Sequence, residues 1–214
     1  MKMRSFWPLL MAGSLGAMGV QADTNERHQL LVGSYTAGQS QGIYRLQFDS
    51  RTGLLDANPL QVIKTDNPSW LTLSKDMTRL FVVNENGPGQ RDPVGKVSSY
   101  TIDPKTHELS LINQVQSLGN EPTHSSLSGD GRHLLVSNYS VVEDPGGTLA
   151  VLPVAADGKL SPPVQLSSHQ PSRVNPERQM SAHVHAAVSS PDGKYVFAND
   201  LGADKVFIYR YDPK

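Results

Sequence analysis

The sequence predicts an all-β fold, a β-propeller of four-stranded blades, and two observations carry this prediction. An acidic turn recurs at Asp49, Asp103, Asp157 and Asp212, which gives a nearly constant period of about 54 residues. The same short strand patterns return in the same order between these turns, and no stretch after residue 22 has a helical period of usable length. A fixed period is typical of repeat architectures, and four strands per repeat is typical of propeller blades.

Each strand of the repeat has its own sequence pattern. One is a short apolar run that ends in polar residues, and it covers 30–35, 80–85, 134–139 and 195–200. A second alternates apolar and polar residues, and it covers 43–48, 97–102 and 206–211. The acidic turn and a further short strand, such as 111–115, follow the second pattern. An inner strand precedes the apolar run and closes on a turn such as 190–193, in which Pro fixes φ and Gly supplies a positive φ.

The number of repeats predicts an incomplete ring. Propellers have four to eight blades, whereas residues 23–214 hold about three and a half repeats. We therefore expect a partial β-propeller domain over 23–214, truncated at its C-terminus, whose terminal sheets have uncovered edges. A β-sandwich with coincidental spacing is the alternative.

Residues 1–22 predict an export signal. Lys2 and Arg4 precede an apolar run over 6–20, and a small-residue site ending at Ala22 precedes Asp23. The run is short and rich in Gly and Ser for a spanning helix, which needs about 20 apolar residues. We expect cleavage after Ala22, a periplasmic location and no stable membrane association afterwards, with an uncleaved anchor as the alternative.

The composition excludes several function classes. Nineteen Lys and Arg residues balance 20 Asp and Glu residues, so no basic surface is expected to attract nucleic acid. The chain has no cysteine, which excludes disulfides, a thiol nucleophile and thiolate metal sites. The chemistry must come from oxygen and nitrogen groups, and we predict no cofactor.

Histidines at the starts of the inner strands are the first candidate group. Alignment of these strands places Trp70, His124 and His185 at one position, and His183 is predicted to share a strand face with His185. Inner strands line the channel of a propeller, so these side chains should converge near one mouth. A His-x-His pair suits proton transfer, a structural role, or a metal with a third ligand from Asp200 or Asp204. The prediction includes no metal, and the metal site remains an alternative.

The third repeat carries an insertion. His124 and His185 lie farther apart in the sequence than one period, and the extra length falls in 169–180. Departures from a repeat are where function tends to be added. Arg173 and Arg178 in this loop are candidates for holding a carboxylate, a phosphate or a developing oxyanion, with solvated arginines as the alternative.

Polar pairs at the ends of the apolar strands are the third group. Asn84, Asn138 and Asn199 begin these pairs, and the repeated Asn is predicted to cap a turn. The following residue differs between repeats, which suits a binding site better than a shared structural need. Glu85 and Asp200 are therefore the carboxylate candidates.

Several of these segments together resemble a known family. Residues 182–206 are similar to the signature of the seven-bladed β-propeller lactonases, the cycloisomerase 2 or 6-phosphogluconolactonase family. Residues 33–36 with 42–44, residues 80–85, and residues 138–139 with 146–147 are also similar. Together with the export signal, the chain resembles most the periplasmic gluconolactonase branch. The resemblance covers essentially all of 23–214 and implies seven blades, of which about half are present.

The resemblance implies hydrolysis of a sugar lactone, gluconolactone or 6-phosphogluconolactone, to the aldonic acid in carbohydrate metabolism. Export favours the unphosphorylated lactone, because the phosphorylated one is a cytoplasmic metabolite. Direct attack by water is expected, since no serine lies in a nucleophile-elbow motif. A muconate-lactonising relative and a non-enzymatic periplasmic propeller that binds protein or glycan remain open.

Chemistry and resemblance together predict roles for eight residues. His183 or His185 is the general base, and Arg178 completes the predicted catalytic group by stabilising the oxyanion. The predicted substrate-binding residues are Glu85, His124, Asn138, Arg173 and Asp200.

Overall fold

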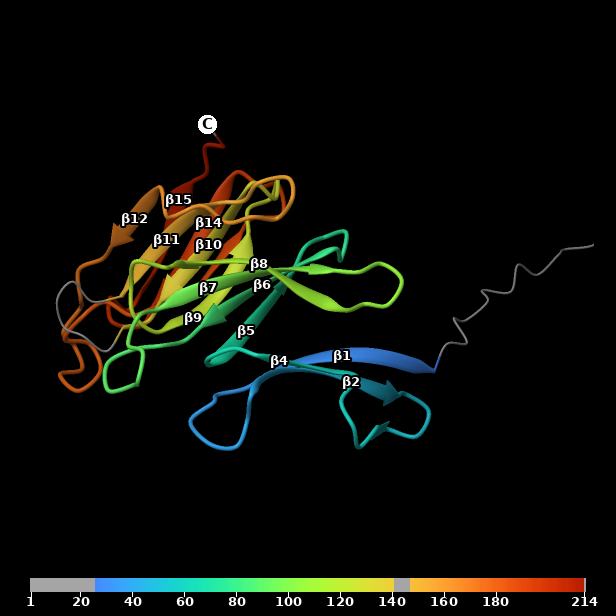
Figure 1. Cartoon of the computed structure of the whole chain (residues 1–214). Helices are drawn as coiled ribbons and strands as arrows, with labels where there is room; N and C mark the ends of the chain where they lie inside the picture. The colour runs from blue at the N-terminus through green and yellow to red at the C-terminus, as the bar shows by residue number, and fades with distance from the viewer. Residues whose placement is uncertain (1–25, 141–146, 214) are drawn as a thin grey trace, which may run out of the picture.

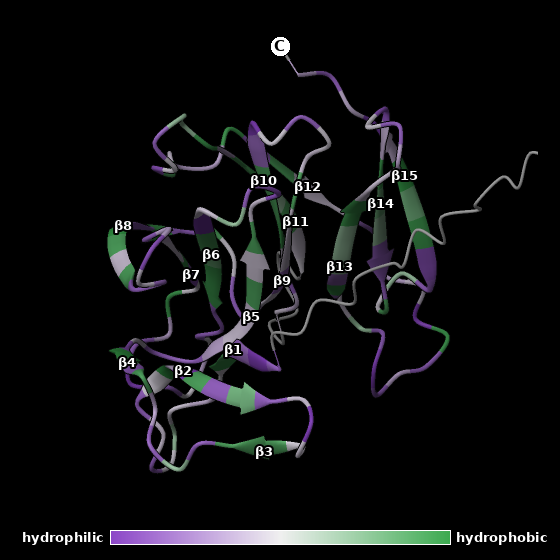
Figure 2. Ribbon diagram, turned by 90° about the vertical axis from the view of Figure 1, so that its right-hand side faces the viewer, coloured by the Kyte–Doolittle hydropathy of each residue, from purple (hydrophilic) through white to green (hydrophobic). Residues whose placement is uncertain are grey.

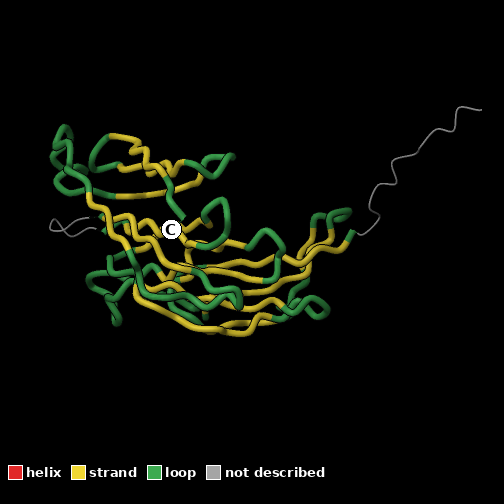
Figure 3. Tube along the Cα trace, turned by 90° about the horizontal axis from the view of Figure 1, so that it is seen from above, coloured by secondary structure: helices red, strands yellow, loops and turns green. Residues whose placement is uncertain are grey.

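Every regular element in the described part of the chain is a β-strand. The computed structural model describes residues 26–140 and 147–213, and Figure 3 shows strands and loops there without a helix. No helix in these ranges is therefore long and apolar enough to cross a membrane. The predicted signal segment lies outside the described residues.

The strands form four antiparallel sheets in chain order (Figure 1). The first sheet contains β1 (Arg27–Gly33), β2 (Gly42–Asp49), β3 (Leu54–Leu55) and β4 (Gln61–Lys64). The second contains β5 (Pro68–Leu73), β6 (Arg79–Asn84), β7 (Lys96–Ile102) and β8 (Leu109–Gln116). The third contains β9 (Pro122–Leu127), β10 (His133–Asn138), β11 (Thr148–Pro153) and β12 (Gln165–Ser168). The fourth contains β13 (Val184–Ser189), β14 (Tyr195–Asp200) and β15 (Lys205–Arg210).

The strand order within the sheets confirms the predicted repeat. The second and third sheets run in sequence order, from β5 to β8 and from β9 to β12, as blades do. The inner strands β5, β9 and β13 lie side by side, and β1 contacts β5. In Figure 2 the strands of neighbouring sheets carry hydrophobic residues, which are coloured green.

The core lies between neighbouring sheets. On β6, Leu80 and Val82 pack toward the first sheet, while Phe81 and Val83 pack toward the third. Both faces of this strand are therefore buried, which explains its continuous apolar run. On β10, Leu135 likewise faces the fourth sheet.

The repeated turns hold their shape with the side chains that the sequence predicts. The Asp49 carboxylate accepts hydrogen bonds from the amides of Arg51 and Thr52, and the Asp103 carboxylate does the same two and three residues on. The turn before each apolar strand repeats a second arrangement, in which a Ser hydroxyl donates to an Asp two residues on. Its members are Ser74 and Asp76, Ser128 and Asp130, and Ser190 and Asp192.

These turns correct the predicted alignment of the strand ends. Asp200 pairs with the first residue of β15, as Asn84 and Asn138 pair with the first residues of β7 and β11. Asp200 is therefore the equivalent of the repeated Asn, and Leu201 is the equivalent of Glu85. The prediction that Asp200 matches Glu85 is wrong by one residue, because the alignment began at the apolar runs instead of at the turns.

A β-bulge corrects the predicted position of His185. Each inner strand shifts register at its first residues, at Ser69 in β5, Thr123 in β9 and His185 in β13. His185 is thus the equivalent of Ser69 and Thr123, whereas Ala186 takes the position of Trp70 and His124. The predicted common face for His183 and His185 is also wrong, because alternation does not continue through a bulge.

The insertion lies between β12 and β13, where the sequence places it. β6 begins at Arg79, β10 at His133 and β14 at Tyr195, so the second of these two intervals is the longer one. The inserted loop docks on the end of β14. The Ser172 amide donates to Gly202 O (2.8 Å), and Gln179 Nε2 donates to Leu201 O (3.0 Å).

Candidate functional site

A cavity of about 500 Å³ opens where the inner strands begin. We call it the mouth cavity, and its lining residues are Gly33, Ser34, Tyr35, Ser69, Glu85, Thr123, Tyr139, Arg178, His185 and Leu201. Two repeated positions supply most of this lining. The bulges supply Ser69, Thr123 and His185. The segments that follow β1, β6, β10 and β14 supply Tyr35, Glu85, Tyr139 and Leu201, respectively. All four sheets therefore contribute to one site.

Tyr139 is the central side chain of the mouth cavity. Its ring stacks on His183, with centroids 4.6 Å apart and planes at 18°. His185 meets the same ring edge-on, with centroids 5.9 Å apart. The phenol oxygen accepts a hydrogen bond from Arg178 Nη2 at 3.0 Å. Tyr139 thus connects the three predicted catalytic residues.

The two predicted general bases have different surroundings. His185 is exposed and lines the mouth cavity. His183 is buried beneath Tyr139, and its Nδ1 lies 2.6 Å from Ser140 O and 2.9 Å from Tyr139 O. Since a carbonyl only accepts, Nδ1 of His183 carries the proton and donates it. This geometry gives His183 a positioning task and leaves His185 as the imidazole that faces the cavity.

His124 lies on β9, the strand next to the one that carries His185. It is buried, its ring centroid lies 4.5 Å from that of Trp70, and its Nδ1 has no partner in the described residues. Burial, with a smaller contribution from the charge of His185, lowers the pKa of His124. His124 is therefore neutral at neutral pH, and it does not line the mouth cavity.

Glu85 and Tyr35 line the mouth cavity as a hydrogen-bonded pair. Partial burial, the hydrogen bond to Glu85, and the charges of Glu85 and Glu121 together raise the pKa of Tyr35 to about 12. The phenol therefore stays protonated and donates to the Glu85 carboxylate. The second oxygen of such a carboxylate can still accept hydrogen bonds from a hydroxylated ligand.

The insertion loop brings only one of its two predicted arginines to the cavity. Arg178 lines the cavity and donates to Tyr139. Arg173 is exposed, has a positive φ of 58° and is not among the lining residues.

Two other predicted substrate-binding residues are buried away from the cavity. Asp200 accepts hydrogen bonds from the amides of His183 (2.8 Å) and Ala203 (2.9 Å), and its other oxygen lies 2.6 Å from His169 Nδ1. Asn138 is fully buried, and its Nδ2 donates to Thr148 Oγ1. The Asp200 carboxylate thus holds backbone amides in place, whereas Asn138 bonds to another buried side chain.

The metal alternative needs a third ligand near the two histidines. Among the described residues, no three His, Asp or Glu side chains converge in the geometry of a metal site. Asp200 bonds to His169 instead, so it does not complete a set with His183 and His185.

Sequence reasoning missed Tyr35, Tyr139, Ser69 and Thr123. Counting from the Ser and Asp turns, which are fixed in each repeat, would have aligned Leu201, and not Asp200, with Glu85 and Tyr139. The sequence gives no sign of the bulges, because the bulged residues Ser69, Thr123 and His185 share no side-chain type that marks the position.

Comparison with known proteins agrees with this arrangement. A family model described as "Lactonase, 7-bladed beta-propeller" matches residues 29–214. The chain belongs to the seven-bladed β-propeller lactonase family. The predicted all-β propeller fold and the predicted family are thereby confirmed, and this lactonase-family chain supplies part of a seven-bladed ring.

Three relatives place the chain within the family. It is 35% identical over 179 residues to the 6-phosphogluconolactonase of Bacillus subtilis, covering 84% of this chain and 48% of the relative. A solved structure of the periplasmic gluconolactonase of Pseudomonas aeruginosa is 56% identical, with a TM-score of 0.83, and covers 87% of this chain and 51% of that one. A putative 6-phosphogluconolactonase from Bacteroides uniformis is 36% identical, with a TM-score of 0.73 and coverages of 88% and 51%. The chain thus spans about half the length of the relatives it matches.

Proposed function

We propose that this chain forms the catalytic mouth of an exported lactonase that hydrolyses an unphosphorylated sugar lactone, with glucono-1,5-lactone preferred over its 6-phosphate. The observation that supports this most is the mouth cavity, which is lined by an exposed imidazole from β13, a guanidinium from the insertion loop and a carboxylate that follows β6. A small cavity with a few convergent polar groups is the usual form of a small-molecule site. The lactonase names of the relatives supply the reaction class.

The proposed reaction needs a base and an oxyanion donor. His185 takes a proton from a water molecule as the water oxygen attacks the lactone carbonyl carbon. The negative charge that develops on the carbonyl oxygen is stabilised by Arg178, whose guanidinium is aimed by Tyr139. The ring C–O bond then breaks, the proton returns to the leaving oxygen, and the aldonic acid forms.

The remaining lining groups suit a polyol. Glu85 accepts hydrogen bonds from substrate hydroxyls, and the hydroxyl groups of Ser69 and Thr123 at the equivalent bulges add donors and acceptors. His183 positions Tyr139 from below by stacking. We keep Arg173, His124, Asn138 and Asp200 outside the group that touches substrate, because the cavity lining does not include them.

The predicted export signal supports the choice of the free lactone. Lys2 and Arg4 followed by the apolar run indicate passage out of the cytoplasm, where phosphorylated sugars are retained. The mouth cavity is lined by one guanidinium and one carboxylate, a weaker match for a phosphate dianion than for hydroxyl groups.

A pH-stat assay tests the proposal, using protein from the complete reading frame that carries this chain. Glucono-1,5-lactone should be hydrolysed well above its spontaneous rate and faster than 6-phosphogluconolactone and muconolactone. No turnover of any lactone would contradict the proposal and favour a binding propeller. Preferred turnover of 6-phosphogluconolactone would overturn the substrate assignment.

The insertion loop offers a matched pair of variants. Arg178→Ala should lower kcat/KM by about a hundredfold, the usual cost of losing an oxyanion donor. Arg173→Asn, which tolerates the positive φ at this position, should leave it unchanged. Equal losses in both variants would show that the loop acts only through its fold.

A further inference from the structure

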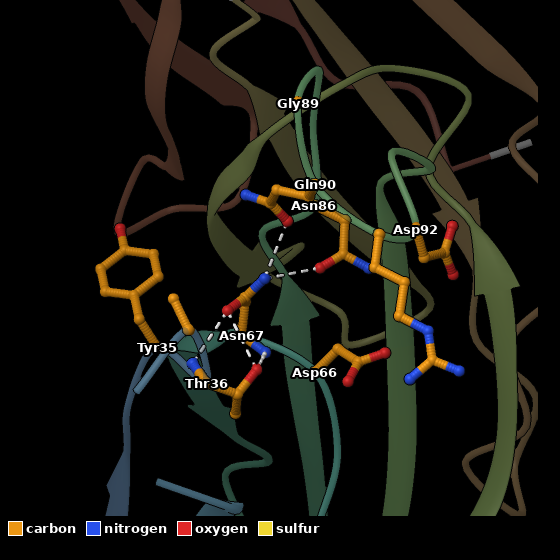
Figure 4. A pocket seen from close by; sticks show the side chains of 10 residues that line it. Tyr35, Thr36, Asp66, Asn67, Asn86, Gly89, Gln90 and Asp92 are labelled. Carbon is orange, nitrogen blue, oxygen red and sulfur yellow. Dashed lines mark hydrogen bonds between the residues drawn. The ribbon is translucent and has the colours of Figure 1, made fainter. Parts of the chain in front are cut away.

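A second cavity of about 750 Å³ adjoins the mouth cavity. We call it the side cavity, and its lining residues are Tyr35, Thr36, Ala37, Asp66, Asn67, Asn86, Gly89, Gln90, Arg91 and Asp92. Tyr35 lines both cavities. A ligand long enough to extend past the Tyr35 ring therefore occupies both cavities at once. Figure 4 shows Tyr35 at the edge of the side cavity, with Asp66 and Asp92 on its other side.

One side-chain amide, that of Asn67, connects three loops that line the side cavity. Asn67 Nδ2 donates to Asn86 Oδ1 and Gln90 Oε1, each at 2.9 Å, and Asn67 Oδ1 accepts from the Thr36 amide at 2.9 Å (Figure 4). Gln90 in turn donates to Glu85 O at 3.4 Å, beside the mouth cavity. Three loops are thereby tied together, and a preorganised wall lowers the entropic cost of binding.

The polar groups that remain available suit hydroxyl groups. The side chains of Asp66 and Arg91 are exposed and make no hydrogen bond or ion pair with other described residues. One carboxylate accepts and one guanidinium donates, so together they match the paired donors and acceptors of a sugar ring. Tyr35 is 57% exposed and offers an apolar face on which a sugar ring can stack.

We propose that the side cavity binds a second sugar ring, so that the enzyme acts on glycosylated aldonolactones, the lactones of oxidised disaccharides. This inference rests on the proposed lactone hydrolysis in the mouth cavity. The lactone ring occupies the mouth cavity between Glu85 and His185, and the glycosyl group passes Tyr35 to reach Asp66 and Arg91. Each volume lies in the range of about 300–1,000 Å³ that is usual for small-molecule sites.

Paired substrates test this proposal on the protein from the complete reading frame. Cellobiono-1,5-lactone or melibiono-1,5-lactone should show a kcat/KM at least tenfold above that of glucono-1,5-lactone. Arg91→Ala and Asp66→Ala should each reduce this preference severalfold without changing glucono-1,5-lactone hydrolysis. Arg210→Ala, which removes an exposed arginine on β15, serves as the control and should change neither rate.

The outcomes separate this inference from the proposed function. Hydrolysis of glucono-1,5-lactone with no preference for either disaccharide lactone, or equal losses on both substrate types in Arg91→Ala, would overturn the inference and leave the lactonase function standing. Binding gives a readout that does not depend on turnover. Calorimetric titration should show cellobionate binding tighter than gluconate, with the difference lost in Arg91→Ala. Equal affinities would also contradict the inference.

Discussion

At the scale of single residues, Tyr139 carries the connections on which the mouth cavity depends. Its ring separates the buried His183 from the exposed His185, and its hydroxyl holds Arg178. Aromatic rings supply contact area with few rotatable bonds, so this side chain fixes its neighbours at a low entropic cost. We therefore treat Tyr139 as the residue that aligns the proposed base with the proposed oxyanion donor.

Tyr139→Phe separates these two contributions. The ring and its stacking on His183 remain, while the hydrogen bond to Arg178 is lost. Hydrogen bonds to charged groups contribute about 1.5 kcal/mol or more, which corresponds to at least a tenfold loss in kcat/KM. The measurement is steady-state lactone hydrolysis together with the midpoint of thermal unfolding, which should stay within a few degrees of the parent. An unchanged kcat/KM would show that Arg178 is aimed by other groups.

Asp200 illustrates a buried charge held by hydrogen bonds. Burial alone would raise the pKa of its carboxyl group, but hydrogen bonds from His169 and from the amides of His183 and Ala203 outweigh burial and lower the pKa. The ionised form is thus favoured in the folded state. Its stabilisation is present above the unfolded pKa of about 3.9 and is lost as the pH falls through the lower folded value.

Asp200→Asn should flatten this pH dependence. In the parent, the free energy of unfolding falls as the pH drops below about 4, and in the variant this part of the fall is missing. Urea unfolding at a series of pH values measures the difference. Asp204→Asn, at an exposed position with a positive φ that Asn tolerates, is the control and should keep the parental slope. A parental slope in Asp200→Asn would contradict the assignment.

At the scale of elements, the insertion loop is positioned by its contact with the end of β14. Gly202 lies against this loop so closely that an added Cβ would lie 1.8 Å from Ser181 O. The opposing atom belongs to the backbone, so no side-chain rotation relieves the clash. The loop that carries Arg178 therefore depends on a glycine at this position.

Gly202→Ala should displace the loop and lower activity more than stability. We expect at least a tenfold fall in kcat/KM, and hydrogen exchange should increase over 172–181 while the strands of the second sheet keep their protection. Gly38→Ala provides the comparison, because an added Cβ there meets nothing within 4 Å. Parental activity in Gly202→Ala would show that the loop tolerates the shift.

The inner strands show what the sequence predicts well and what it hides. The repeated turns and the apolar run of β6 follow from local chemistry, from Asp side chains that accept backbone amides and from burial on two faces. The bulge at His185 does not, since it depends on pairing with β14. It changes the predicted relation of His183 to His185, whereas Asp200 falls outside the site because it takes the position of the repeated Asn. Side-chain direction at a strand end therefore needs the register, which no local pattern supplies.

At the scale of the whole molecule, repetition builds the site. Equivalent positions in successive sheets carry different residues. After β1, β6, β10 and β14 these are Tyr35, Glu85, Tyr139 and Leu201. The shared strands, turns and core fix these positions, so the side chains there are free to vary with function. The chain spans about half the length of its curated relatives.

The most direct test is the kcat/KM of His185→Ala for glucono-1,5-lactone, measured by pH-stat next to His28→Ala on the protein from the complete reading frame. His28 is an exposed histidine on β1 that bonds to Ser50, outside both cavities. If His185 is the general base, its replacement lowers kcat/KM by a factor of about 10²–10⁴, while His28→Ala keeps the parental value. Parental activity in a folded His185→Ala protein would contradict the mechanism and remove the mouth cavity as the site of hydrolysis.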